Sequence, residues 1–522
     1  MMNEYKETLN RVGNMQSTEN GAIGYSTSGK NLVDLNFVVP SNHNNVGTDT
    51  IVKFCQALGD DPVTTVKWLF YLRDIREGLG ERGSFIELFQ ALYNYDSHIA
   101  LSVLSLIPEY GRWKDLIDLL AISIKEDDGL YSYIFDIIAK QFKEDCFNMS
   151  ENKSISLLAK WMPSINASSK SRNIAKRLAR HFCLNYAGYR KILSTMREYI
   201  DVTERKTCAN KWGEIDYNKV SSNANARYVH SFMKHDEARR QVYLDSLVSP
   251  SGSAVMHATN LYPHEVYAKY NRGGYVSNYV QADPGIEALW SNLKQAENIG
   301  NVMVVVDGSG SMETHIAGSS IMAIDVSRSI GAYFAERANG VFKNKLIEFS
   351  ERPRYIDLSN CKTLADKYNT LNKFDDCSNT NLEKVFDLLL VTAIKYNIPQ
   401  DELPNKILVI SDMEFDRATN YNKYNCDGDH MGVMSAYNTL FETIKGRWTA
   451  AGYTMPGIVF WNVNSRTNTI PVSSNECGVT LVSGFSPNIV KMIISGEIDP
   501  WNSLKAVLDS PRYDAIAEAL KN

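Results

Sequence analysis

The stretch Val302-Met303-Val304-Val305-Val306-Asp307-Gly308-Ser309-Gly310-Ser311 decides how the second half of this chain should fold. Its apolar part predicts a buried strand, and the residues behind it place one carboxylate and two hydroxyls at the carboxyl end of that strand. The two glycines let the backbone turn tightly enough for Asp307, Ser309 and Ser311 to converge. Because such hard oxygen ligands suit Mg²⁺, Mn²⁺ or Ca²⁺, the string predicts a divalent-cation site.

Two later features of the chain support a site at this place. Thr380 begins an apolar-periodic segment as the N-terminus of a helix would, and Asp412 follows a second apolar run, Ile407–Ile410. Open α/β sheets place their sites at the carboxyl ends of parallel strands, where these side chains would meet. The alternative is that Thr380 and Asp412 merely cap helices, as Thr and Asp often do. Capping and metal ligation are compatible, so both interpretations stay open.

Taken in order, Asp307, Ser309, Ser311, Thr380 and Asp412 resemble the metal-ion-dependent adhesion site of von Willebrand factor A domains. The resemblance implies that Asp307, Ser309, Ser311 and Thr380 surround one Mg²⁺, Mn²⁺ or Ca²⁺, directly or through water. Asp412 would complete the shell. It also implies a cation left one ligand short, so that an acidic side chain of a partner protein can bind it.

Composition limits the kind of molecule that carries this site. A chain of 522 residues is too long for one hydrophobic core, and 44% apolar with 22% charged residues is typical of a soluble globular protein. No apolar run is long enough to span a bilayer, and the polar N-terminus lacks a signal-peptide core. We therefore expect no membrane partner and a cytoplasmic protein, or a virion-associated one if its source is a virus. Eight scattered cysteines without a CxxC pair indicate reduced thiols.

The chain changes character near residue 295. Before it, amphipathic helical segments alternate with short turns rich in helix breakers, which predicts a HEAT-like α-helical array. After it, strands expected at 302–306, 346–349, 407–410, 457–461 and 479–482 alternate with helices expected at 316–337 and 382–396. We therefore expect an α plus α/β fold, with a polar segment over 1–45, the helical array over 46–295 and a doubly wound parallel sheet over 296–522.

The net charge of −5 hides a strongly basic block. Between Asn152 and Arg197 the chain has ten basic residues and no acidic one. On a helix over 171–185, Arg172, Lys176 and Arg180 would share one face. Most runs of charged residues are simply solvated surface. Here the absence of acidic residues and the nearby aromatics Phe182, Tyr186 and Tyr189 favour contact with a nucleic acid instead, although aromatics at this spacing are at least as often core residues as stacking residues. The predicted contacts are Arg172, Lys176, Arg177, Arg180, Arg190, Lys191 and Arg197.

A second resemblance covers most of the chain. The strings YLRDIREGLGER (71–82) and IPEYGRWKDL (107–116) are similar to signatures of the TROVE module in Ro-type RNA-binding proteins. The chain resembles DUF2828, a family related to Ro, more closely still. Its marks are TENGAIGYSTSG (18–29), KWMPSINASS (160–169), YRKILSTMR (189–197), LYPHEV (261–266), DGSGSM, SDMEFD (411–416), VFWNVN and LVSGFS. The resemblance implies a monomeric ring of HEAT-like helices closed by a von Willebrand factor A domain, with small structured or misfolded RNA as its partner.

Several features have more than one interpretation. Arg73 and Arg76 lie near Asp74, Glu77 and Glu81, so they could form ion pairs within the module or bind phosphate. We expect no enzyme, because the nine histidines form no HExxH motif and no G-x-S-x-G motif is present. Two other functions remain. One is a protein-interaction or virion-associated scaffold acting through the metal site, and the other is a metal-dependent nuclease.

Overall fold

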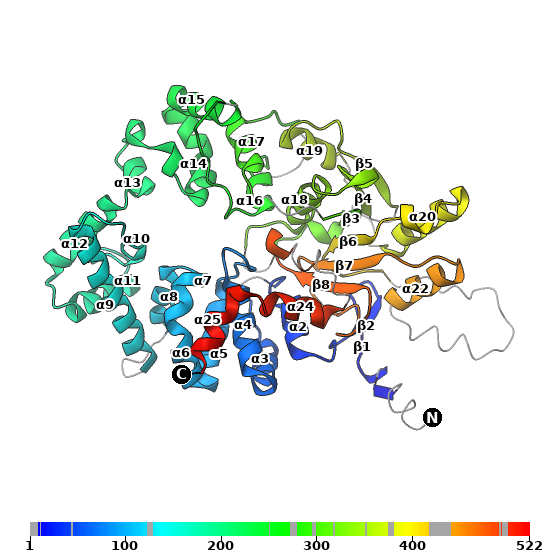
Figure 1. The fold of residues 1–522 in the computed structure, drawn as a ribbon, viewed down its shortest axis with the longest axis horizontal. Coiled ribbons are helices and arrows are strands. Elements are labelled where there is room, and N and C mark those ends of the chain that lie inside the picture. The colour runs from blue at the N-terminus through cyan, green and yellow to red at the C-terminus, as the bar shows by residue number, and fades with distance from the viewer. Residues whose placement is uncertain are drawn as a thin grey trace. The chain divides into compact units, whose positions relative to one another are not determined.

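The structure is a computed structural model that describes residues 9–10, 12–42, 45–122, 129–249, 251–271, 279–294, 299–316, 319–349, 352–373, 381–416, 440–489, 492 and 499–521. The chain divides into two compact units. The sheet unit comprises residues 1–57 and 261–510, and the helical unit comprises residues 58–260 and 511–522. The α plus α/β fold class is confirmed, because a helical array precedes a mostly parallel sheet (Figure 1).

The sheet unit is built on six strands in the order β5-β4-β3-β6-β7-β8. Every neighbouring pair is parallel except β4 and β5, which are antiparallel. The chain leaves β3 toward β4 on one side and later returns to its other side as β6, so the strand order reverses at β3. The strands are β3 Val302–Asp307, β4 Lys345–Phe349, β5 Arg354–Asp357, β6 Lys406–Ser411, β7 Gly457–Asn462 and β8 Val479–Ser483.

Helices cover this sheet, and its central helix packs closely. Helix α18, Ala323–Ala335, is buried along its whole length and packs on β3, β4 and β6. Gly331 makes that approach feasible, because a Cβ there would lie 2.4 Å from Val306 Cγ1. The helix begins later than expected, since His315 and Met322 form an isolated antiparallel bridge ahead of it. The other helices are α16 Pro263–Tyr267, α17 Pro284–Ser291, α19 Leu364–Leu371, α20 Glu383–Tyr396, α22 Leu440–Ala450 and α24 Pro500–Leu508.

The N-terminal segment belongs to the sheet unit. A short hairpin of β1, Met15–Ser17, and β2, Ile23–Tyr25, is followed by α2, Asn31–Val38, which packs against β8 and α24. Asn462 Nδ2, at the end of β7, donates to the Phe37 carbonyl at 3.0 Å. The observed division therefore differs from the expected 1–45 segment, because six residues of α2 are buried.

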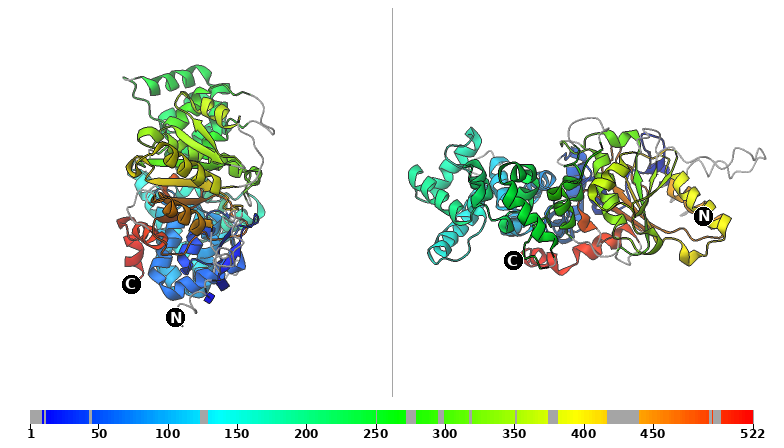
Figure 2. Two further views of the ribbon diagram at one scale, coloured as in Figure 1. Left: turned by 90° about the vertical axis from the view of Figure 1, so that its right-hand side faces the viewer. Right: turned by 90° about the horizontal axis from the view of Figure 1, so that it is seen from above.

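The helical unit is an array of short helices whose neighbours in sequence pack on one another. Figures 1 and 2 show this array from three directions. Helix α3, Thr48–Asp60, runs across the division between the units. The others are α4 Pro62–Arg73, α5 Gly83–Tyr95, α6 Ser97–Val103, α7 Ile107–Tyr110, α8 Trp113–Ile122, α9 Gly129–Ser150, α10 Leu158–Trp161, α11 Ser169–His181, α12 Tyr186–Tyr199, α13 Thr203–Cys208, α14 Ser222–His235, α15 Glu237–Val248 and α25 Asp514–Ala519.

The last residues of the chain return to the helical unit. Arg512 Nε donates to Asp74 Oδ2 at 2.9 Å and Arg512 Nη1 to Glu109 Oε1 at 2.9 Å. The Tyr110 hydroxyl donates to the Arg512 carbonyl at 2.7 Å, and the Tyr110 and Tyr513 rings stack with centroids 5.7 Å apart. These contacts explain why residues 511–522 leave the sheet unit, whereas the expected division was 296–522. Among the described helices, none has the length and apolarity needed to cross a membrane.

Candidate functional site

The carboxylates of Asp307 and Asp412 meet at the carboxyl ends of β3 and β6. The two strands are parallel neighbours with Val306 opposite Ile410, so the residues that follow lie side by side. Asp307 Oδ2 accepts a hydrogen bond from the Ser411 hydroxyl at 2.5 Å, and Asp307 Oδ1 accepts one from the Ser309 N–H at 2.9 Å. Neither Asp307 nor Asp412 retains any exposed surface. The register of one strand pair therefore brings two acids together in the protein interior.

Two hydroxyls complete this cluster. The Ser309 and Ser311 Oγ atoms are 2.9 Å apart. A hydrogen bond from the Ser311 side chain reaches Asp412 and lowers the pKa of its carboxyl. Four of the five predicted metal residues are thus brought together. The fifth, Thr380, lies outside the described residues.

The electrostatics of the cluster favour a bound cation. The pKa of Asp307 is raised to about 7 by burial and, to a lesser degree, by the charge of Asp412, while hydrogen bonds from Ser411 and Ser309 oppose the rise. Burial also raises the pKa of Asp412, while the charge of Arg466 lowers it. A divalent cation would relieve both the burial cost and the repulsion.

The donor set fits a hard divalent cation. Asp307, Asp412, Ser309 and Ser311 offer only oxygen atoms, which Mg²⁺, Mn²⁺ and Ca²⁺ prefer. The described residues contain no group of three or more His, Cys, Asp or Glu side chains arranged to hold a metal. A site built here must therefore use the serine hydroxyls and water beside its two carboxylates.

Sequence reasoning missed a third buried acid, which lies next to Asp307 and Asp412. Glu414 has no exposed surface, and its carboxylate accepts from the backbone N–H groups of Arg466 and Thr467 at 2.8 Å each and of Glu19 at 2.9 Å. Arg466 Nη2 then lies 3.4 Å from Asp412 Oδ2 and 2.9 Å from Glu19 Oε2. The string SDMEFD contains Glu414, but no pattern in the sequence links it to residues 52 and 395 positions away.

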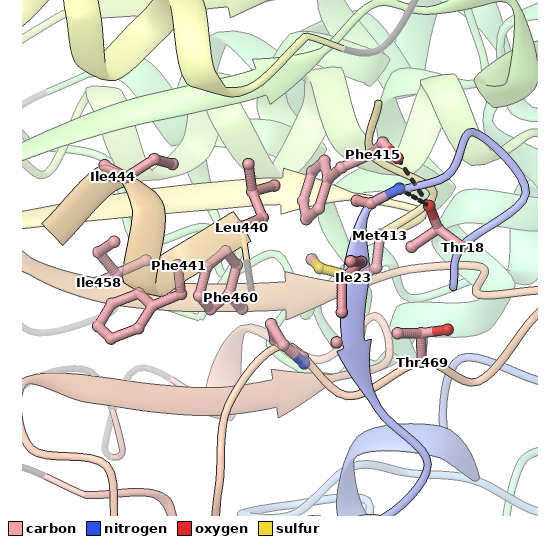
Figure 3. Close-up of a pocket in the computed structure, with 13 residues that line it drawn as sticks. Thr18, Ile23, Met413, Phe415, Leu440, Phe441, Ile444, Ile458, Phe460 and Thr469 are labelled. Atoms are coloured by element: carbon pink, nitrogen blue, oxygen red, sulfur yellow. Dashed lines mark hydrogen bonds between the residues drawn. The ribbon is translucent and has the colours of Figure 1, made fainter. Parts of the chain in front are cut away.

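An apolar pocket adjoins the same loop and is closed in part by the N-terminal hairpin (Figure 3). Met413 follows Asp412 with φ of 64° and lines the pocket together with Ile23, Phe415 and Phe460. Thr18 fixes the hairpin here, since its hydroxyl donates to the Phe415 carbonyl at 2.7 Å. The apolar lining offers nothing to a cation, so the pocket and the metal site are chemically distinct.

The predicted nucleic-acid contacts lie mostly on α11 and α12 of the helical unit, which pack together. Ile174 and Leu178 of α11 are buried, as the pattern predicted. Lys176 and Arg177 are partly exposed, with Lys176 Nζ 6.0 Å from the Tyr186 ring and the Arg177 guanidinium 5.1 Å from the Tyr131 ring. The exposed members are Arg172, Arg180, Arg190 and Lys191.

Arg197 differs from the other predicted contacts. Its Nε donates to the Ala159 carbonyl at 2.8 Å and its Nη2 to the Met162 carbonyl at 2.6 Å, and burial lowers its pKa. These carbonyls belong to α10 and the residue that follows it, where backbone acceptors lack helical partners. The side chain is therefore committed to the framework of the helical unit.

The three aromatic residues predicted for base stacking also separate. Phe182 stacks on Phe142 with centroids 4.4 Å apart, and Tyr189 is 1% exposed, with its hydroxyl donating to the Pro163 carbonyl at 2.9 Å. Tyr186 is 43% exposed. Two of the three are therefore packing residues, and Tyr186 alone among them presents a ring to solvent.

The arginines of the YLRDIREGLGER string form ion pairs inside the helical unit. Arg73 Nη2 lies 2.7 Å from Asp115 Oδ2, with both side chains buried, and Arg76 Nη1 lies 3.4 Å from Glu109 Oε1. Of the two interpretations left open by the sequence, the ion-pair network is the one present.

Two family models match separate parts of the chain. Residues 18–130 and 177–300 match the family described as "Domain of unknown function (DUF2828)". The DUF2828 resemblance is thereby confirmed. Residues 301–510 match a second family, "Domain of unknown function (DUF7788)", and that match begins immediately before β3. The DUF2828 match therefore includes β2 and α2 as well as much of the helical unit.

One curated relative and one solved structure are similar over most of the chain. "Uncharacterized protein L728" of Acanthamoeba polyphaga mimivirus is 27% identical over 534 residues, covering 95% of this chain and 88% of that protein. The "Crystal structure of Deinococcus radiodurans RO (RSR) protein" aligns with a TM-score of 0.46 and 11% identity, covering 90% of this chain and 100% of that chain.

Proposed function

We propose that this protein is a non-catalytic RNA-binding protein of the Ro kind. It binds structured or misfolded RNA through the basic residues of α11 and α12, and it holds Mg²⁺, or Mn²⁺ or Ca²⁺ in its place, between Asp307 and Asp412. The observation that carries the proposal is that Arg172, Arg180, Arg190 and Lys191 are exposed and form no ion pair with any described carboxylate. Phosphates are the partners such cations lack, and binding them would release counterions.

Other cations of the helical unit make the contrast clear. Lys160 lies 3.2 Å from Glu204 Oε1, Lys206 lies 2.7 Å from Asp201 Oδ1, and Lys211 lies 3.0 Å from Glu214 Oε1. These three residues already have carboxylate partners, so a phosphate would have to displace an acid. The unpaired cations of α11 and α12 would bind phosphate without that cost.

The test is a salt titration of binding to an RNA hairpin with a single-stranded tail. Wild type is compared with the variant Arg180→Glu, Arg190→Glu, Lys191→Glu. We expect the reversal to flatten the slope of log K against log salt by about 0.7 to 0.9 per lost phosphate contact. The matched control reverses three exposed cations that already have acidic partners, Arg205→Glu, Lys211→Glu and Lys219→Glu. Equal effects of the two reversals, or no binding by wild type at low salt, would refute the assignment.

A second candidate function is a scaffold that grips a partner protein through the metal. It is favoured by the buried pair Asp307 and Asp412 beside two hydroxyls, since a cation held there would accept one more acidic ligand from a partner. Chelation with EDTA separates the two functions. It should abolish docking through the metal and leave RNA binding on α11 and α12 unchanged.

The proposal also holds that the protein is not a nuclease. Labelled RNA incubated with the protein and Mg²⁺ should give no cleavage product beyond that of Asp307→Ala. Product formed by wild type and lost in Asp307→Ala would replace the non-catalytic function with metal-dependent hydrolysis.

A further inference from the structure

Arg466 bridges two acidic side chains at the edge of the metal site. Its Nη2 atom lies 3.4 Å from Asp412 Oδ2 and 2.9 Å from Glu19 Oε2. The Asp412 carboxylate is fully buried, whereas the side chains of Arg466 and Glu19 are 34% and 48% exposed. One guanidinium therefore connects the buried site to the N-terminal segment, and its exposure leaves it room to move.

The backbones that carry this bridge are fixed by Glu414. The same carboxylate accepts from the N–H groups of both Glu19 and Arg466, at 2.9 Å and 2.8 Å. Asn20 adds a bond from its side-chain amide to the Glu414 carbonyl at 2.6 Å. Because Glu414 follows Asp412 by two residues, the loop that positions Asp412 also positions both members of the bridge. The backbones are held in place, so what remains variable is where the two exposed side chains point.

A divalent cation and the Arg466 guanidinium would compete for binding to the Asp412 carboxylate. Two positive groups sharing one buried oxygen repel each other strongly where the surroundings are poorly polarisable. Glu19 offers Arg466 a second carboxylate at shorter distance, outside the buried site. A bound cation would therefore shift Arg466 from Asp412 to Glu19 without leaving it unpaired.

We propose that Arg466 and Glu19 form an ionic latch on the metal site, in which Arg466 bridges Asp412 and Glu19 when no divalent cation is bound and keeps only Glu19 when one binds. This inference rests on the proposed metal site and not on RNA binding. It assigns a regulatory role to residues 18–20, which become sensitive to the state of the cation.

The latch predicts opposite effects for its two members. Arg466→Gln removes the competing charge and should tighten Mg²⁺ or Mn²⁺ binding by about three- to tenfold, as expected for loss of one nearby partly screened charge. Glu19→Gln removes the alternative partner of Arg466 and should weaken cation binding. In the double variant Arg466→Gln, Glu19→Gln, the second substitution should not change cation affinity further, because no guanidinium remains for Glu19 to bind. Isothermal titration calorimetry on the full chain measures all four affinities.

A second readout does not depend on affinity alone. In EDTA, Arg466→Gln should lower the melting temperature, because Asp412 loses its counter-cation. Added Mg²⁺ should then raise the melting temperature more in Arg466→Gln than in wild type. Lys505→Gln, an exposed cation on α24 of the same unit, removes the same charge away from this network and should change neither quantity. Arg466→Lys is held in reserve in case the glutamine variant fails to fold, and should bind the cation more tightly than wild type because lysine lacks the Nη2 atom that contacts both acids.

The outcomes separate the latch from the metal site itself. If Arg466→Gln binds the cation and wild type does not, the result would strongly support the latch. Unchanged or weaker binding by a folded Arg466→Gln, while wild type binds, would overturn the latch and leave the metal site standing. Failure of both proteins to bind would overturn the two together. Weaker binding on adding Glu19→Gln to Arg466→Gln would make Glu19 a direct ligand and overturn the latch.

Discussion

The candidate metal site of the sheet unit and the helix pair α11 and α12 use charge in opposite ways. At the sheet edge, Asp307, Asp412 and Glu414 are fully buried. Each of these carboxylates accepts a hydrogen bond from a backbone N–H group. On α11 and α12, Arg180, Arg190 and Lys191 are exposed and pair with no described acid. The first arrangement fixes the conformation of the chain. The second leaves binding capacity for something outside it.

The difference teaches how to assign roles to charged residues. A buried carboxylate costs several kcal/mol unless hydrogen bonds or a cation compensate it, so its partners within the chain reveal what it does. An exposed cation costs almost nothing, and the informative observation is that it has no acidic neighbour. The two regions should therefore respond differently to substitution, to pH and to salt.

Of the substitutions that test this difference, removal of the Glu414 carboxylate should have the largest effect on the free energy of unfolding. Glu414→Ala removes a fully buried charged acceptor that binds the N–H groups of Glu19, Arg466 and Thr467, so we expect a loss of roughly 3–5 kcal/mol in the free energy of unfolding. Urea denaturation followed by circular dichroism measures it. Glu402→Ala, an exposed acid of the same unit, should stay within about 0.5 kcal/mol of wild type. Equal stability of the two variants would contradict the role assigned to Glu414.

The helical unit offers a buried acid of its own for a parallel test. Asp74 has no exposed surface and binds Arg512 at 2.9 Å and the Tyr513 hydroxyl at 3.3 Å. Asp74→Ala should cost roughly 2–3 kcal/mol in the free energy of unfolding, because Arg512 Nε and the Tyr513 hydroxyl lose their buried acceptor, although Arg512 keeps Glu109. A chain ending at Ser510 should lose a similar amount if Asp74 acts through residues 511–522. Asp136→Ala is the control, since Asp136 is 70% exposed and lies 3.4 Å from His181.

The pH dependence of the cation-free protein provides a third test. The pKa of Asp307 is about 7 in the folded chain against an ordinary value of 3.8, so the folded state binds more protons than the unfolded state between these values. The contribution of Asp307 to stability in EDTA should therefore fall as pH rises from about 4 to 7, by on the order of 4 kcal/mol, and change little above that range. The raised pKa of Asp412 acts in the same direction.

Asp307→Asn should remove most of this slope and also abolish cation binding. Thermal unfolding at a series of pH values in EDTA measures the slope. Mg²⁺ affinity in wild type should rise with pH over the same interval, because the cation binds the ionised acids. A wild-type stability that does not fall relative to that of Asp307→Asn across this interval would contradict the inference that Asp307 and Asp412 repel each other.

The meeting of Asp307 and Asp412 could be predicted from the sequence. Each follows an apolar run of strand length, and parallel strands end at one edge, so topology alone brings the two acids close. The burial of Ile174 and Leu178 followed from helical periodicity in the same way. In both cases a local pattern carries the information.

The Glu414 network and the division of the chain could not be predicted in this way. Glu414 binds N–H groups near residues 19 and 466, and backbone donors leave no trace in residue identity. The burial of α2 depends on β8, and the return of residues 511–522 depends on Asp74, both distant in sequence. Arg197 and Arg180 also look alike in the basic block, although only one of them finds backbone carbonyls.

The substitution with the smallest expected effect tests whether the exposed surface of α11 and α12 includes an aromatic ring on which a base stacks. Tyr186 is 43% exposed beside Lys176, whereas Phe182 and Tyr189 are packed inside the unit. If a base stacks on this ring, Tyr186→Leu should weaken binding of single-stranded RNA by about 1 kcal/mol and leave the salt slope unchanged, since no charge is lost. Tyr95→Leu, which removes a similarly exposed tyrosine from α5, should have no effect. Fluorescence anisotropy at several salt concentrations separates the two contributions. A change in slope without a loss of affinity would mean that Tyr186 only supports Lys176, and that RNA reads this helix pair by charge alone.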